Sequence, residues 1–221
     1  MQTQLIERAL SAIPTSPTII SLEVFQSKSG ISGKTVARQV LYFLGKFGIG
    51  SFASGGVKFS NIDRLKAALV AIEMGCDIEL ISKRIDWRDF ECLTAHILDS
   101  LGYHIKSNLR LVKPRIELDV VAINANFAIV IDCKHWNYNN ASALSRFAKK
   151  QENRTKILLN KDEGLHRALP VLVTLHSSIV HCSHDVPIVP ISKFKQFVLD
   201  LDGYEGTVRF VNRQNNRSIV H

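Results

Sequence analysis

IELDVVAINANFAIVIDCKHW, residues 116–136, is the stretch that decides the fold of the second half of the chain. β-branched and aromatic residues fill it on both sides of Asn124-Ala125-Asn126, a triplet that tolerates the dihedral angles of a turn. The pattern predicts two β-strands joined by a tight turn, a β-hairpin. With the turn centred on Ala125, positions that sum to about 250 should pair across the hairpin.

Two aspartates then stand at one end of this hairpin, one on each strand. The pairing sets Asp119 beside Ile131 and Asp132, and Lys134 faces the same side as Asp132. Carboxylates opposed in an apolar hairpin repel each other and lose hydration. A divalent cation such as Mg2+ would offset both costs, because it is held by one or two carboxylates. The alternative is an ordinary hairpin end at which water solvates both acids.

Composition bounds the class of protein. The chain has 221 residues, of which 46% are hydrophobic, enough for one large or two small domains with real cores. No run of about 18 apolar residues and no secretory signal is present, so we expect a cytoplasmic protein with no membrane partner.

The four cysteines lack CxxC spacing and are expected to be reduced. For the motif HCSH, residues 181–184, we favour a polar loop over a metal site.

Positive charge is concentrated in two parts of the chain. The net charge of +8 and the pI near 9.4 favour an anionic partner. Residues 28–66 hold seven bases against one acid, Asp63, and residues 104–161 hold eleven bases against four acids. Two of those four acids are Asp119 and Asp132. Each half therefore carries a basic region suited to phosphate groups, although a solvated lysine face is the simpler explanation of any one cluster.

The N-terminal half has the pattern of helices followed by a small hairpin. An amphipathic helix is expected over residues 1–13, a second over 21–30 that is capped by Ser21, and a third that is capped by Ser32. Residues 49–60 then form short arms around a Ser-Gly-Gly turn. This order resembles a winged helix-turn-helix DNA-binding domain, which we assign to residues 1–85; a protein-interaction module is the alternative. The expected DNA contacts are Lys34, Thr35, Arg38 and Lys58.

The C-terminal half alternates between helical and strand patterns. A helix carrying Glu91 precedes a strand over 103–112, and the hairpin is followed by a helix from Ser142. Strands over 170–180, 186–191 and 207–211 and a helix over 192–201 complete the pattern. The sequence thus predicts an α/β domain over residues 86–221, with a mixed sheet flanked by helices.

The order of these elements and their charged residues resembles the PD-(D/E)xK nuclease superfamily, in particular archaeal Holliday-junction resolvases and Mrr-type restriction endonucleases. The likeness covers residues 87–180, and Glu91, Asp119, Asp132 and Lys134 match the helical acid, the two strand acids and the lysine. Gln151 matches a polar residue that some members carry on the following helix. The chain departs from the pattern where Leu118, and not proline, precedes Asp119. The implied fold is restriction-endonuclease-like.

The resemblance also implies roles for the matching residues. Mg2+, which Mn2+ could replace, would be bound by Asp119, Asp132 and the backbone carbonyl of Cys133. Glu91 would hold a metal-bound water or a second ion. Lys134 would sit over the attacking water and favour hydroxide. An ordinary salt bridge from Lys134 to Asp132 or Glu91 is the competing interpretation.

The expected function is a metal-dependent DNA endonuclease that an N-terminal domain brings to its substrate. The helix 142–156 would bind the phosphate backbone through four basic residues, Arg146, Lys149, Lys150 and Arg154. Cutting two strands with one site per chain requires two chains, so a homodimer is expected, associated with the nucleoid if the source is a prokaryote. A non-catalytic DNA-binding or regulatory protein on a nuclease scaffold and a nuclease that acts on RNA are the alternatives.

Overall fold

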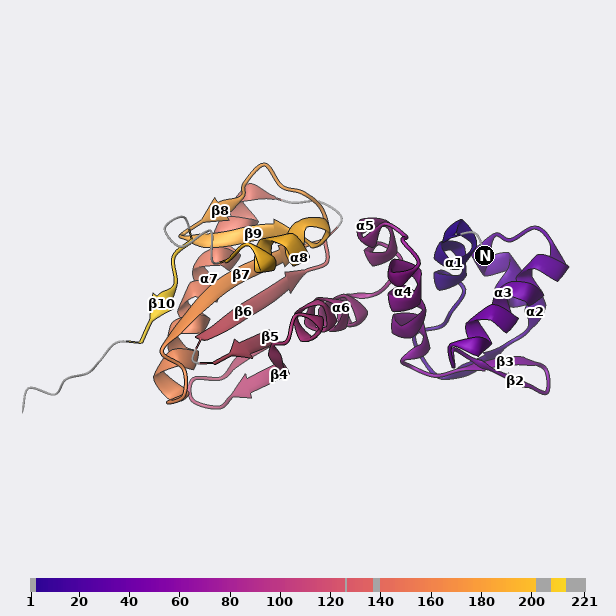
Figure 1. Cartoon of the computed structure of the whole chain (residues 1–221), viewed down its shortest axis with the longest axis horizontal. Coiled ribbons are helices and arrows are strands. Elements are labelled where there is room, and N and C mark those ends of the chain that lie inside the picture. Colours follow the sequence, from indigo (N-terminus) through magenta and orange to yellow (C-terminus); the bar gives the residue numbers. More distant parts are fainter. Residues whose placement is uncertain (1–2, 126, 137–139, 202–207, 214–221) are drawn as a thin grey trace, which may run out of the picture. The chain divides into compact units, whose positions relative to one another are not determined.

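The chain divides into two compact units, residues Met1–Leu93 and Thr94–His221, and each is described by itself below (Figure 1). The computed structural model describes residues 3–125, 127–136, 140–201 and 208–213. The division falls within helix α6 (Trp87–Ser100), which Asp86 caps by accepting the backbone N–H groups of Arg88 and Asp89 at 3.0 Å. Among the described residues, no helix is long and apolar enough to cross a membrane.

The N-terminal unit is mainly helical and contains one small antiparallel sheet. Its strands lie in the order β1-β3-β2, with β3 between its two neighbours. The elements in chain order are α1 (Thr3–Leu10), β1 (Thr18–Ile20), α2 (Leu22–Ser29), α3 (Lys34–Lys46), β2 (Ser51–Ala53), β3 (Gly56–Phe59), α4 (Asp63–Glu73) and α5 (Ile78–Ser82).

The helix caps agree with the sequence in one case and differ in another. Ser21 accepts the backbone N–H of Val24, and Gly30 ends α2 in the left-handed conformation, as expected. The expectation that Ser32 caps α3 is wrong. Gly33 occupies the N-cap in extended conformation without a side-chain hydrogen bond, while the Ser32 carbonyl accepts the side-chain amide of Gln26 at 2.8 Å.

Strand β1 was not expected, because three residues are too few to show a strand period. It pairs with β3 so closely that a Cβ at Gly56 would lie 2.0 Å from the carbonyl oxygen of Ile20. Only glycine fits at that position. The hairpin is joined to α4 by the buried carboxylate of Asp63, which accepts the N–H groups of Gly50 at 3.1 Å and Ser60 at 2.8 Å.

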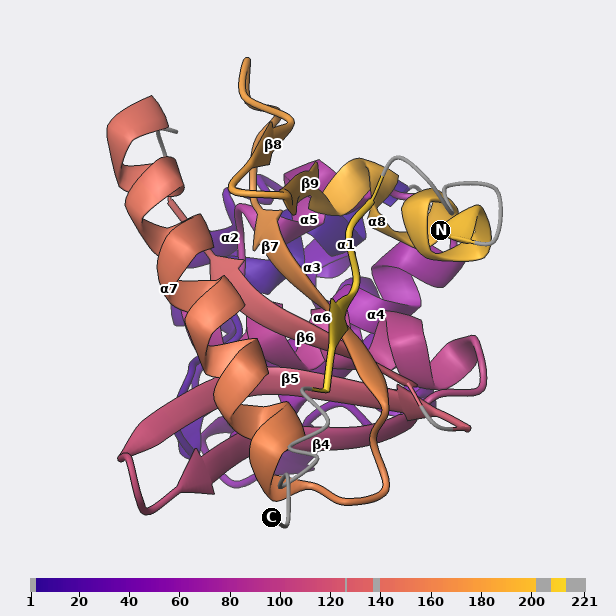
Figure 2. The same ribbon diagram turned by 90° about the vertical axis from the view of Figure 1, so that its left-hand side faces the viewer.

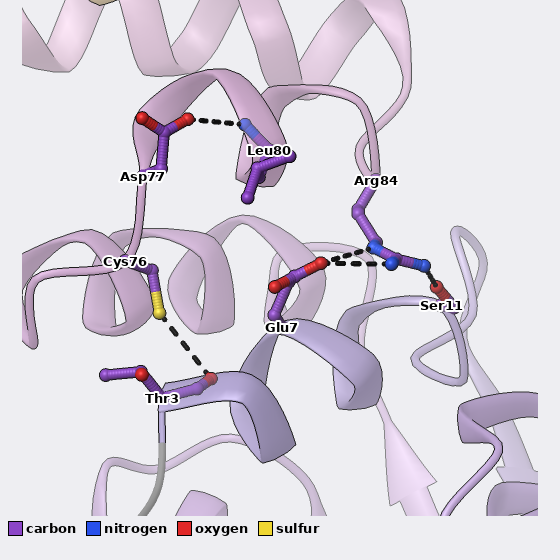
Figure 3. Close-up of polar contacts among 7 residues, drawn as sticks. All are labelled: Thr3, Glu7, Ser11, Cys76, Asp77, Leu80 and Arg84. Atoms are coloured by element: carbon purple, nitrogen blue, oxygen red, sulfur yellow. Dashed lines mark hydrogen bonds and ion pairs between the residues drawn. The ribbon is translucent and has the colours of Figure 1, made fainter.

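The last helices of the N-terminal unit are tied back to its first (Figure 3). Arg84 follows α5 and donates from two guanidinium nitrogens to Glu7, at 3.2 and 3.0 Å, and from the third to Ser11 at 3.0 Å. The thiol of Cys76 reaches the carbonyl of Thr3 on α1. These contacts join segments more than 70 positions apart, so α5 packs as part of the N-terminal unit.

The C-terminal unit is built on a mixed seven-stranded sheet, which confirms the predicted α/β class. The strands run in the order β4-β5-β6-β7-β9-β8, with β10 also paired to β7. The first three are antiparallel, whereas β6, β7 and β9 are parallel neighbours. Their bounds are β4 (His104–Leu111), β5 (Ile116–Asn124), β6 (Phe127–Lys134), β7 (Arg167–Thr174), β8 (Cys182–Ser183), β9 (Val186–Pro190) and β10 (Val211–Asn212).

Helix α7 (Ala141–Lys161) connects the parallel strands β6 and β7 and lies across one face of the sheet (Figure 2). Its apolar side chains enter two core clusters, one with Leu158 and Leu159 against β5 and β6, the other with Leu144 and Ala148 against β7 and β9. Helix α8 (Ile191–Leu199) contacts β9 and β7. The sheet therefore has the flanking helices that the alternating pattern predicted.

Strand limits near the end of the chain differ from the expectations. Strand β7 ends at Thr174 and not at residue 180, because Thr174 turns its hydroxyl to the carbonyl of His176 and the chain leaves the sheet. Strand β8 is only two residues long and was not expected. Strand β10 covers Val211 and Asn212; Thr207, where the last strand was expected to begin, and Asn126 of the hairpin turn lie outside the described residues.

Candidate active site

The hairpin of β5 and β6 brings the two aspartates together as its sequence predicts. Val120 pairs with Ile131, and Ala125 has a positive φ of 49° at the turn. One position beyond that pair, the carboxylate of Asp119 accepts the backbone N–H of Cys133 at 2.8 Å. Asp119 is therefore held beside Asp132 by the backbone of β6.

Asp132 is the most enclosed acid of the C-terminal sheet and is paired with two cations. Only 4% of it is exposed, and 9% of Lys134. The ammonium of Lys134 pairs with Oδ2 of Asp132, and Nη1 of Arg154 donates to Oδ1 at 3.0 Å. Lys134 lies on β6 two residues after Asp132, so the period of two directs both side chains to the same face. The salt bridge between Lys134 and Asp132 that we considered from the sequence is present.

Aromatic rings enclose the ammonium of Lys134. Its Nζ lies 4.4 Å from the ring centre of Phe147 and 5.6 Å from that of Trp136, and these two rings meet edge to face at 5.2 Å. Ring faces carry partial negative charge and attract a cation, more strongly where water is excluded. The rings and Asp132 together hold this amine at one place.

Asp119 has a perturbed acidity. Burial, and next the nearby charge of Asp132, raise its pKa from 3.8 to about 6. The hydrogen bond from Cys133 and the charges of Lys134 and Arg154 act in the opposite direction but are weaker. Strong perturbation of an acid beside a second acid and a buried lysine is typical of functional sites, although structural ion-pair networks also produce it.

One face of α7 supplies the remaining polar groups of the site. Phe147, Gln151 and Arg154 are spaced i, i+4 and i+7, so they share the face turned to the sheet. The amide of Gln151 donates to the carbonyl of Val130 at 2.9 Å, and its Oε1 is buried with no hydrogen-bond partner among the described residues. Gln151 thus fixes α7 on β6 and leaves one buried acceptor available.

The groups at the hairpin end are of the type that binds a hard divalent cation, but they are few and Asp132 is already paired. Two neighbouring carboxylates and a strand-end carbonyl are the ligands Mg2+ takes in proteins, with water filling the other positions. The described residues contain no group of three or more His, Cys, Asp or Glu side chains that could hold a metal ion. Both oxygens of Asp132 already pair with cations, so a metal ion would have to displace one of them. In the HCSH segment, both Cys182 and His184 are exposed.

The other predicted site residues are on α6, on the outer part of α7 and in the N-terminal unit. Glu91 is half-buried on α6, on the N-terminal side of the division between the units. Arg146, Lys149 and Lys150 stand on the outer part of α7, and all three are exposed. In the N-terminal unit the four predicted DNA contacts are exposed as well, and one of them, Lys34, pairs with Glu23 at 2.8 Å.

Sequence reasoning missed how Arg154 is used. We grouped it with the outward basic residues of α7, whereas its side chain points inward to Asp132 and is 17% exposed. The signal was present in the helical period, because Arg154 follows Phe147 and Gln151 on the apolar face. A polar residue in a buried stripe needs a partner, and here the partner is an acid of the hairpin.

Comparison with known proteins finds a family match over part of the chain and similar solved structures. No curated protein matches the chain. Protein VC1899 from Vibrio cholerae has a similar structure, with 16% identity, a TM-score of 0.42, and coverage of 91% of this chain and 50% of that one. For Can2 from Sulfobacillus thermosulfidooxidans, solved in complex with cyclic tetra-adenylate, the identity is 15%, the TM-score 0.35, and the coverage 91% and 49%. The chain spans about half the length of these two proteins. Residues 87–182, which contain the two aspartates, Lys134 and Arg154, match the family described as nuclease-related domain (NERD).

Proposed function

We propose that the chain is a metal-dependent endonuclease of the PD-(D/E)xK type that hydrolyses phosphodiester bonds of DNA. The observation that carries the proposal is the cluster of Asp119, Asp132 and Lys134 at the end of one hairpin, inside the segment that matches the nuclease-related domain. An acid pair beside a buried lysine is not needed to stabilise the hairpin, because well-packed apolar residues would stabilise it at least as well.

The proposed chemistry assigns a task to each side chain. Mg2+, or Mn2+ in its place, would be held by Asp119, Asp132 and the Cys133 carbonyl, and Glu91 would hold a metal-bound water or a second ion. The bound cation would neutralise charge on the phosphate and stabilise the leaving oxygen. Lys134 would counter charge on the attacked phosphate and favour hydroxide over water beside it. Gln151 positions α7 so that Phe147 confines the amine.

Substrate binding would involve both units. The outer face of α7 presents Arg146, Lys149 and Lys150, whose contacts with phosphates would release counterions. The N-terminal unit has the element order α1-β1-α2-α3-β2-β3 with a three-stranded sheet, which supports the winged helix-turn-helix proposal for residues 1–85. Residues 86–221 would then form the nuclease domain. In this assignment α3 presents Thr35 and Arg38 to DNA, and the hairpin presents Lys58.

The proposal extends to assembly and setting. Two copies would be needed to cut both strands of a duplex with one site each, so we propose a homodimer that acts on DNA in the cytoplasm, at the nucleoid in a prokaryote. RNA is the alternative polymer. A non-catalytic nucleic-acid-binding protein is the second candidate function, because the pairing of both Asp132 oxygens with cations would also suit a purely structural network.

A substrate panel tests the proposed function. Linear duplex, branched and single-stranded DNAs and a matched RNA are incubated with the protein and Mg2+, Mn2+ or a chelator. We expect internal cuts in at least one DNA with either metal and none with the chelator. Cleavage of RNA alone would move the assignment to ribonucleases. Binding without cleavage of any substrate would favour the non-catalytic candidate.

A further inference from the structure

A cavity of about 630 Å3 opens in the C-terminal unit between the β4–β5 turn and α7. Its charged lining consists of Arg110, Arg115, Lys150, Arg154 and Glu117. A cavity of this size accommodates a sugar-phosphate unit and is within the usual range for ligand sites. Arg110 lies near the end of β4 and Arg115 in the β4–β5 turn, and neither is among the residues assigned to nucleic-acid binding above.

The charge of the cavity favours an anion. Four cationic side chains line it against one carboxylate, that of Glu117. Glu117 is paired with Arg110, at 3.1 Å to Nε and 3.0 Å to Nη2, so the lining keeps a net charge of +3. Arginine binds phosphate oxygens in a bidentate manner. Three arginines in one cavity therefore suit a phosphate group as the ligand.

Arg154 belongs both to this cavity and to the candidate active site. Its Nη1 donates to Oδ1 of Asp132, while its Nε is buried without a hydrogen-bond partner among the described residues. The guanidinium therefore has donor capacity that Asp132 does not use. A phosphate in the cavity would compete with Asp132 for this group.

We propose that the cavity binds a nucleic-acid phosphate and that Arg154 couples this binding to the binding of a divalent cation at Asp132. The inference rests on the proposed function. A phosphate draws the guanidinium away from Asp132, and Oδ1, relieved of its cationic partner, becomes available to the cation. Coupling of this kind is reciprocal, so the cation also strengthens nucleic-acid binding. Arg154 is then a positioning residue, which prevents tight cation binding until substrate is present.

The test measures cation affinity, not cleavage. Free Mn2+ is followed by electron paramagnetic resonance as the full-length protein is titrated, alone and with a saturating phosphorothioate DNA oligonucleotide that carries a 5′-hydroxyl or a 5′-phosphate. We expect the wild-type protein to bind Mn2+ at least about five-fold more tightly with the oligonucleotide. Enhancement by both forms assigns the cavity to an internal diester, and enhancement by the phosphorylated form alone assigns it to a terminal phosphate.

Two variants separate the parts of the coupling. Arg154→Gln should bind Mn2+ more tightly than wild type without oligonucleotide and show no further gain with it. Arg115→Ala, which leaves the Asp132 pair intact, should match wild type without oligonucleotide and lose most of the enhancement. Lys195→Ala, an exposed lysine of α8, is the matched control and should behave as wild type. Urea unfolding of each variant shows whether it is folded.

The outcomes distinguish this inference from the proposed function. Equal Mn2+ affinity of the wild-type protein with and without a bound oligonucleotide would overturn the coupling, as would full enhancement in Arg115→Ala. Metal-dependent cleavage would remain unaffected by either result. The absence of both Mn2+ binding and cleavage would overturn the proposed function and this inference with it.

Discussion

Two lysine–carboxylate pairs of this protein have the same chemistry in opposite surroundings. In the N-terminal unit, Lys34 and Glu23 are 2.8 Å apart with side chains 59% and 66% exposed. In the C-terminal unit, Lys134 and Asp132 pair with side chains only 11% and 5% exposed, and Arg154 joins them. Water screens the first pair, whereas the second has lost its hydration and depends on its partners.

The difference shows which charged side chains can exchange partners and which are held by the partners they have. An exposed lysine exchanges one partner for another at little cost, so Lys34 can leave Glu23 for a phosphate. A buried amine between Asp132 and two aromatic rings is held in place, which suits a group that acts on a reacting centre and not one that searches a surface. Four experiments probe this comparison, in order of decreasing expected effect.

Removing the central acid should have the largest effect. Asp132→Ala leaves Lys134 and Arg154 buried without their acid, and a loss of about 3–5 kcal/mol in the free energy of unfolding is expected, together with loss of cleavage. Urea denaturation measures the first quantity. Glu152→Ala, which removes a helical i, i+4 pair with Lys156, is the control and should cost about 0.5 kcal/mol or less. Similar losses in both variants would show that the buried ion pairs of Asp132 contribute no more to stability than an exposed pair.

Replacing the amine should separate catalysis from folding. Lys134→Met keeps an unbranched side chain beside Phe147 and Trp136 and leaves Asp132 its bond to Arg154, so the expected loss of stability is about 2 kcal/mol. The cleavage rate should fall by at least about 100-fold. Comparison of turnover at saturating substrate with urea unfolding checks both, and a rate that falls only in proportion to the folded fraction would make Lys134 structural.

The acidity of Asp119 predicts a pH effect on stability. Because its folded pKa is raised from 3.8 to about 6, the stabilisation by its protonated form is complete below about pH 4 and is lost as the pH rises through 6. Asp119→Asn cannot ionise, so in chelator it should be more stable than wild type at pH 7, by about 3 kcal/mol, and nearly equal to it near pH 4. Thermal unfolding at a series of pH values measures this. Parallel curves for the two proteins would contradict the assignment.

The exposed pair should give the smallest effect. Lys34 holds the pKa of Glu23 near 2, so the pair persists at neutral pH, yet Glu23→Gln should cause no measurable loss of stability in urea. The variant should bind DNA slightly more tightly in a gel shift at low salt, because Lys34 is released, while Lys34→Ala with Arg38→Ala should bind more weakly with a shallower salt dependence. Unchanged binding in the double variant would remove α3 from the proposed DNA interface.

Part of the fold could be predicted from residue types around turns. The strands β5 and β6 follow from β-branched and aromatic residues on either side of a turn triplet, and the alternation of side chains along a strand sets Asp132 and Lys134 on one face. The short strands β1 and β8 could not be predicted, since they have three and two residues, no turn signal of their own, and form only because a neighbouring strand binds them.

The candidate site was predictable in its acids but not in their partners. Asp119, Asp132 and Lys134 follow from the hairpin, whereas the partner of Lys134 could have been Asp132 or Glu91, which depends on packing. Arg154 was assigned to the outer surface because charge suggests exposure. Its position on the inner face of α7 indicates that the side chain is buried, and the ion pair with Asp132 explains why a charged residue can be buried there.

Cleavage by folded wild-type protein and Lys134→Met, each with Mg2+ and with chelator, tests the central claim most directly. The wild-type protein should cut nucleic acid with Mg2+ and not with chelator, and Lys134→Met should bind the same substrate but fail to cut it. Cleavage by wild type that persists in chelator, or cleavage by Lys134→Met at the wild-type rate, would contradict the assignment of this hairpin as a metal-dependent nuclease site.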